Sequence, residues 1–138
     1  MSDIPENSVK SREQDILSKL VIDENQASAD LEELVRLAEG MLGIEKTTGQ
    51  IIILNRSILG LREQCMLYLI GATIAKKLGL REVAEMTPQE LSALVRKPAT
   101  TLSKPLGQLV NDGFVTRNEG KYLCAFYRGK EYLQTLRK

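Results

Sequence analysis

The sequence contains no histidine and no tryptophan, and it has only two cysteines, Cys65 and Cys124. The lack of histidine removes the most common general base and the most common metal ligand. Histidine-based catalytic triads, cysteine–histidine pairs and histidine-containing zinc sites are therefore excluded. Glycine loops with the spacing of phosphate-binding or dinucleotide-binding motifs are also missing. We therefore expect a protein that is not an enzyme and that uses no cofactor and no metal.

Long apolar runs are missing as well. No stretch reaches the roughly 18 apolar residues that span a bilayer, and residues 1–12 lack the apolar core of a secretion signal. Two cysteines far apart in such a chain favour reduced, buried thiols over a disulfide framework. We expect a cytoplasmic protein that does not contact a membrane.

The chain has 138 residues, of which 43% are hydrophobic, so one compact domain with a core, or a small domain plus an extension, is expected. The net charge of +1 hides an uneven distribution. Residues 1–60 hold 6 Lys/Arg and 11 Asp/Glu, whereas residues 61–138 hold 13 Lys/Arg and 7 Asp/Glu. This asymmetry favours an anionic partner for the second half, although ordinary solvated surface is the alternative.

The acidic half divides into a flexible tail, residues 1–12, and an extension, residues 13–60. The extension begins with an expected helix over residues 13–23, followed by a polar break over residues 23–28. Asp30 and Glu33 have the spacing of a capping box, which predicts a second helix that ends at Gly40 or Gly43. The apolar stripe of this helix packs on the same chain, on a second copy or on a partner protein.

A small hairpin or an added strand is predicted next, from residues 44–46 and 50–54 around the turn residues 47–50. Its second strand contains four consecutive large aliphatic residues, Ile51 to Leu54. An exposed strand of this composition is unfavourable, so either the basic half or a dimer mate must cover it.

Residues 61–78 predict one long helix whose central part, residues 65–75, is almost entirely apolar or small. A helix that is apolar all round must be buried on more than one side. The second covering surface is either the acidic half or the same helix of another subunit, which the close spacing of Gly71 and Ala75 would permit. We therefore predict a homodimer.

Residues 87–111 predict two helices separated by a tight turn. Thr87 is a suitable N-cap, Pro88 suits the first helical position, and Glu90 can reach back to the cap nitrogen. The second helix is expected over residues 99–111 after a stop at residues 96–98, where the proline restricts the residue before it. Pro105 should bend this helix, unless the helix starts later.

A hairpin and a final helix complete the prediction. Gly113 ends the preceding helix, a strand begins at residues 114–117, and residues 118–120 form the turn. The returning strand covers residues 121–127 and places Tyr122, Cys124 and Phe126 on one face. The last helix covers residues 129–136.

These residues resemble a known family. The segments 90–94, 100–106 and 109–115 look like the winged helix-turn-helix of small prokaryotic transcription regulators. The overall character of the sequence is similar to that of small archaeal regulators. The resemblance covers roughly residues 61–138. It implies a mainly α fold with a small β component (α+β), in which a winged helix-turn-helix carries an N-terminal helical extension.

Two functions follow from the resemblance and the charge. The first is a DNA-binding transcription regulator that binds double-stranded DNA. Its alternative is a protein–protein interaction module within a transcription, replication or repair assembly, with residues 13–60 as a possible partner surface. The acidic wing tip at Glu119 argues for the alternative. Thr100 either caps its helix or contacts DNA. The expected DNA-contacting residues are Lys97, Thr100, Thr101, Ser103, Lys104, Gln108, Arg117 and Lys121.

Overall fold

The computed structural model describes residues 24–136, so the expected tail and the expected helix over residues 13–23 lie outside the described residues. The described part is mostly helical with two small antiparallel hairpins, which confirms the α+β prediction. None of the helices in this part is long and apolar enough to cross a membrane. The elements are α2 (Glu24–Ala38), β1 (Leu42–Ile44), β2 (Ile51–Ile53), the short 3-10 helix η1 (Arg56–Ile58), α3 (Leu61–Lys77), α4 (Pro88–Val95), α5 (Ala99–Asn111), β3 (Thr116–Asn118), β4 (Lys121–Leu123) and α6 (Phe126–Leu136).

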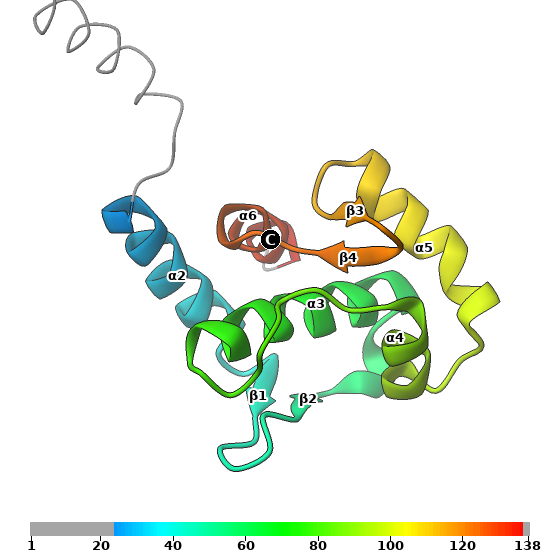
Figure 1. Cartoon of the computed structure of the whole chain (residues 1–138), viewed down its shortest axis with the longest axis horizontal. Coiled ribbons are helices and arrows are strands. Elements are labelled where there is room, and N and C mark those ends of the chain that lie inside the picture. The colour runs from blue at the N-terminus through cyan, green and yellow to red at the C-terminus, as the bar shows by residue number, and fades with distance from the viewer. Residues whose placement is uncertain (1–23, 137–138) are drawn as a thin grey trace, which may run out of the picture.

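Helix α3 is the centre of the core. Every residue from Cys65 to Ala75 is buried. Figure 1 shows α3 running between the β1–β2 hairpin on one side and β4 and α6 on the other, with α4 and α5 near one end. The β1–β2 hairpin of the acidic half therefore covers α3 within a single chain. This arrangement removes the reason given above for a homodimer, because the apolar helix needs no second copy to exclude water.

The β1–β2 hairpin provides much of this cover. Its register pairs Leu42 with Ile53, and the predicted turn lies between the strands. Ile51 and Ile53 are buried, whereas the alternate residue Ile52 is 46% exposed, as expected for successive side chains of a strand. A Cβ atom on Gly71 would lie 2.6 Å from the Cγ2 of Ile51. Gly71 thus permits close approach of a strand, and not of a second helix as predicted.

Helix α2 begins at Glu24, so the predicted polar break over residues 23–28 is wrong from Glu24 onward. Ala27 and Ala29 have the highest helix propensity, and they outweigh the polar residues around them. The end of the helix was predicted correctly, because α2 stops at Ala38 and Gly40 follows with a φ of 84°.

Helix α6 begins at Phe126, and the returning strand ends at Leu123, so the predicted strand over residues 121–127 is too long. Gly129, which we expected at the start of the last helix, lies inside it. A Cβ atom at this position would be 3.1 Å from Leu34 Cδ1 and 3.2 Å from Ile70 Cγ1. Gly129 therefore marks a close contact of α6 with α2 and α3, and not a helix boundary.

Candidate nucleic-acid interface

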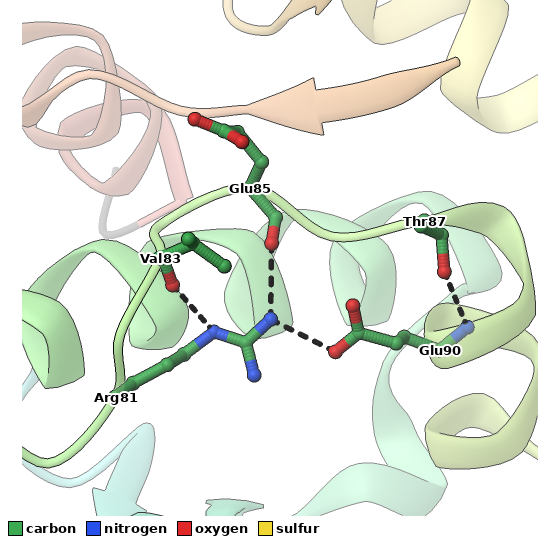
Figure 2. Close-up of polar contacts among 5 residues, drawn as sticks. All are labelled: Arg81, Val83, Glu85, Thr87 and Glu90. Carbon is green, nitrogen blue, oxygen red and sulfur yellow. Dashed lines mark hydrogen bonds and ion pairs between the residues drawn. The ribbon is translucent and has the colours of Figure 1, made fainter. Parts of the chain in front are cut away.

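Helix α4 starts as the sequence predicts. The Thr87 hydroxyl accepts a hydrogen bond of 3.1 Å from the backbone nitrogen of Glu90, and Pro88 occupies the first helical position. The predicted return contact from the Glu90 carboxylate to the cap nitrogen is wrong. That carboxylate instead forms an ion pair of 2.8 Å with Arg81 (Figure 2). A basic partner from the preceding segment competes successfully with the cap nitrogen because the pair is charge-assisted.

Arg81 also holds the segment that leads into α4. Its Nε donates to the carbonyl of Val83 at 2.7 Å, and its Nη2 donates to the carbonyl of Glu85 at 3.0 Å. Figure 2 shows the guanidinium between this segment and the Glu90 side chain. One side chain thus fixes the position of the α4 start relative to the chain before it.

The turn between α4 and α5 is built on a left-handed residue. Arg96 has a φ of 64°, and its backbone nitrogen donates to the Ser92 carbonyl at 2.8 Å. The Ser92 hydroxyl donates to the carbonyl of Lys97 at 2.6 Å. The helix therefore ends through a left-handed cap at Arg96, in addition to the restriction that Pro98 imposes on Lys97.

Helix α5 is continuous from Ala99 to Asn111 and carries Pro105 inside it, which rules out the later start considered above. Leu102, Leu106 and Leu109 are buried, and Pro105 is buried with them. The buried side of α5 packs against α3 and α4. Its opposite side is consequently available to solvent.

All eight predicted contact residues are exposed. The N-cap position of α5 is Pro98, so Thr100 does not cap this helix, and that alternative is wrong. Within residues 24–136, the hydroxyls of Thr100, Thr101 and Ser103 make no hydrogen bond to the rest of the chain. These side chains are free to meet an external partner.

The β3–β4 hairpin follows α5. Its register places Arg117 opposite Tyr122, and the Arg117 guanidinium carbon lies 5.7 Å from the centre of the Tyr122 ring. Glu119 and Gly120 form the two-residue loop with φ values of 52° and 76°, the signature of a type I′ turn. Lys121 begins the returning strand and is exposed. The hairpin thus presents two basic side chains near its tip.

A backbone bridge connects this hairpin to α4. Met86, just before the α4 cap, pairs with Tyr122 through hydrogen bonds of 2.9 and 2.8 Å. Figure 1 shows α5 running from the turn beside α4 to the hairpin, so the predicted cations lie at both ends of this helix and, at Lys104, within it. Lys97 precedes its start, and Arg117 and Lys121 follow its end.

Sequence reasoning missed two basic residues beside Lys97. A surface hollow of about 520 Å³ lies between η1, the start of α3 and the end of α4, and Arg56 and Arg96 both line it. The Arg56 side chain reaches the carbonyl of Val95, a residue 39 positions away. Arg56 belongs to the acidic half, so the local pattern of charge holds no signal for this contact.

Neither cysteine is available as a nucleophile. Both are buried, and burial raises the pKa of the Cys65 thiol and of the Cys124 thiol to about 12. The reactive thiolate form is therefore absent at neutral pH. Among residues 24–136, His, Cys, Asp and Glu side chains form no group of three or more that could hold a metal ion.

No protein-family model matches the chain, and neither the curated proteins nor the solved structures contain a match.

Proposed function

We propose that residues 61–136 form a winged helix-turn-helix and that the protein is a DNA-binding transcription regulator. In this proposal α4 and α5 are the helix-turn-helix, α5 is the recognition helix, and the β3–β4 hairpin is the wing. The protein carries out no catalytic reaction. The β1–β2 hairpin covers α3, and residues 24–60 are an N-terminal extension of the winged helix-turn-helix.

The observation that carries the proposal is the two-sided character of α5. Its apolar residues are buried, while Thr100, Thr101, Ser103, Lys104 and Gln108 are exposed and project from the first turns of the helix onward. The recognition helix of a helix-turn-helix contacts base edges through residues at its N-terminal end. Short hydroxyl side chains suit a helix that lies deep in the major groove, and lysine can contact guanine or phosphate.

The alternative function is a protein-binding module. Its support is the Glu119 carboxylate at the hairpin tip and the exposed aliphatic side chains of the acidic half. Ile52 is 46% exposed, Leu54 is 43% exposed and Ile58 is 80% exposed. Contiguous apolar patches on a protein surface mark sites of protein contact. A partner protein would bind through residues 13–60 in this case.

A homodimer remains part of the DNA-binding proposal on a different observation. Val35 is 46% exposed and Leu78 is 61% exposed, and both line a hollow of about 250 Å³ between α2, β1 and the end of α3. Two copies of a helix-turn-helix read two half-sites about one helical turn apart. Sedimentation equilibrium should give a dimer of the 15.4 kDa chain. A monomer at tens of micromolar, an order-of-magnitude working concentration, removes the dimer from the proposal.

Duplex binding tests the proposal itself. The full chain should bind a random-sequence duplex at low salt, and log affinity should fall linearly with log salt at a slope of several units. A dimer would present Lys97, Lys104, Arg117 and Lys121 twice, which gives about eight candidate phosphate contacts. If the chain shows no measurable duplex binding at low salt, the DNA-binding reading is wrong and the protein-binding module replaces it.

Variants of α5 locate the interface. Thr101→Ala or Lys104→Ala should cost roughly 1–3 kcal/mol on a duplex selected for tight binding and should relax discrimination against other sequences. Lys77→Ala is the matched control, because Lys77 is an exposed lysine in the last turn of α3. Equal losses for Lys77→Ala and Lys104→Ala would show that α5 does not enter the groove.

A further inference from the structure

The hollow beside the turn between α4 and α5 is basic. Arg56, Arg96 and Lys97 line it, and none of its lining residues is acidic. These three cations come from two segments far apart in the chain, η1 and the turn that follows α4. Their convergence on one concave surface creates a positive potential that favours an anion.

The three cations differ in how free they are. Arg56 is held in place, because its Nε donates to Gln64 Oε1 at 3.1 Å and its Nη2 donates to the Val95 carbonyl. Within residues 24–136, the Arg96 guanidinium and the Lys97 ammonium have no hydrogen bond or ion pair to the chain. The hollow therefore combines one fixed cation with two that are available to bind a ligand.

The backbone at Arg96 adds to this. Arg96 has a φ of 64°, which lies in the left-handed region. Glycine adopts this region without strain, whereas a residue with a Cβ atom does not. Arginine at this position costs folding free energy relative to glycine. A residue held at such a cost is consistent with a role for its guanidinium outside the fold.

We infer that this hollow binds a phosphate group of the DNA backbone, with Arg96 and Lys97 as its direct contacts and Ser57 on its rim as a hydroxyl donor. The inference rests on the proposed function and extends its interface from α5 to η1, in the acidic half. Guanidinium groups bind phosphate oxygens with two parallel hydrogen bonds, and hydroxyl groups are common phosphate donors. Lys97 lies two residues before α5 starts, so a duplex whose groove receives α5 passes this hollow with its backbone.

Two pairs of variants test the inference. Arg96→Asn removes the charge but keeps a residue that tolerates the left-handed region, and Arg96→Lys keeps the charge. Ser57→Glu places a carboxylate on the rim, and Ser57→Gln has a similar shape without the charge. Ser57 is exposed and lies outside α3, α4 and α5, so its variants leave those helices intact. Far-ultraviolet circular dichroism melts check that each variant folds.

The expected result is a uniform loss on random duplex DNA for Arg96→Asn and Ser57→Glu. Arg96→Asn should also reduce the salt slope by about one, as the loss of one phosphate contact requires. Ser57→Gln should bind close to the original chain. Arg96→Lys keeps the charge but not the two parallel hydrogen bonds of a guanidinium, so it should lose less affinity than Arg96→Asn and keep the original salt slope. If Arg96→Asn and Ser57→Glu both bind DNA with the original affinity and slope, the hollow takes no backbone phosphate.

Two further outcomes are informative. If the original chain binds no duplex, the proposed function is wrong, and this inference falls with it. Amide chemical shifts of Ser57 and Lys97 should move on addition of a short duplex and much less on addition of inorganic phosphate at equal phosphate concentration. If inorganic phosphate moves them as strongly as the duplex does, the hollow is a small-anion site, and the assignment to DNA is overturned.

Discussion

The two hairpins have strands of the same length, three residues each, but they face different surroundings. In β2, Ile51 and Ile53 are buried against α3. In β3 every residue is exposed, and in β4 only Tyr122 is buried. The first hairpin therefore serves as part of the core, whereas the second projects from it on one anchoring side chain.

The turns differ in the same way. The first hairpin closes through Glu45, whose carboxylate accepts hydrogen bonds from the backbone nitrogens of Thr47 and Thr48 at 2.8 and 2.6 Å. The second closes in two residues, with Glu119 in the left-handed region and its carboxylate in solvent. An acidic residue is thus structural in one turn and conformationally unfavourable in the other. The comparison teaches that the role of a hairpin follows from its buried face and not from its backbone pattern.

The largest expected difference concerns stability. Ile51→Ala should lower the free energy of unfolding by about 2–5 kcal/mol, because it leaves a cavity under α3. Ile52→Ala, next to it but half exposed, should cost about 1 kcal/mol or less. Urea denaturation of both variants measures the difference, and similar losses would show that the hairpin does not cover α3.

Gly71→Ala tests the same contact from α3 and belongs to the same experiment. It should also destabilise, since its Cβ would meet Ile51 Cγ2 at 2.6 Å. The double variant Gly71→Ala/Ile51→Ala should lose less free energy of unfolding than the sum of the losses of the two single variants.

The second difference concerns DNA. Arg117→Ala in the second hairpin should weaken cognate and random duplexes alike and reduce the salt slope by about one. Lys46→Ala, the matched change in the turn region of the first hairpin, should leave both quantities unchanged. Duplex titrations of both variants over a range of salt concentrations measure the affinities and the salt slopes. Equal slopes for Arg117→Ala and the original chain would remove the hairpin from the interface.

The third difference concerns the exposed turn. Glu119→Asn should stabilise the fold by about 1 kcal/mol, because asparagine tolerates the left-handed region. Glu119→Gln removes the same charge without that preference, so it should tighten DNA binding without a comparable gain in stability. Thermal melts and duplex titrations of both variants separate the two effects. A stability gain of equal size in both would show that charge, and not backbone conformation, is responsible.

The smallest effect concerns pH. Hydrogen bonds from Thr48, first from its backbone and then from its side chain, lower the pKa of Glu45 below its ordinary value of 4.5. A carboxyl with a lowered pKa stabilises the fold above 4.5, and this contribution disappears as the pH falls through the lowered value. Carboxyl carbon shifts in a pH titration should show the depressed pKa. Thr48→Val should raise it toward 4.5, and an unchanged value would contradict the role of that hydroxyl.

Elements with strong local signals were predictable from the sequence. The all-apolar stretch of α3, the Thr87-Pro88 start of α4 and the alternating faces of α5 each carry their information within a few residues. Tight turns were predictable for the same reason. The exposure of the expected contact residues within α5, from Thr100 to Gln108, followed from the period of that helix.

Contacts between distant segments were not predictable. Gly129 looked like a helix boundary, because nothing local shows that Leu34 and Ile70 approach it. Glu90 was expected to complete its own cap, whereas Arg81 reaches it from another segment. The position of Arg56 beside Lys97 was not predictable either, because it depends on a contact with the Val95 carbonyl far along the chain. Side-chain pairing across the fold depends on tertiary packing, and a single sequence reports that only indirectly.

The bridge between Met86 and Tyr122 has a consequence for local unfolding. A two-stranded hairpin of this length is marginal by itself, yet its inner strand shares two backbone hydrogen bonds with the chain that leads into α4. Hairpin opening therefore requires the entry to α4 to detach as well. The amide protons of Met86 and Tyr122 should give one common free energy of opening in deuterium exchange, as members of a single cooperative unit. The angle between the hairpin and the two helices is accordingly preserved until that whole unit opens.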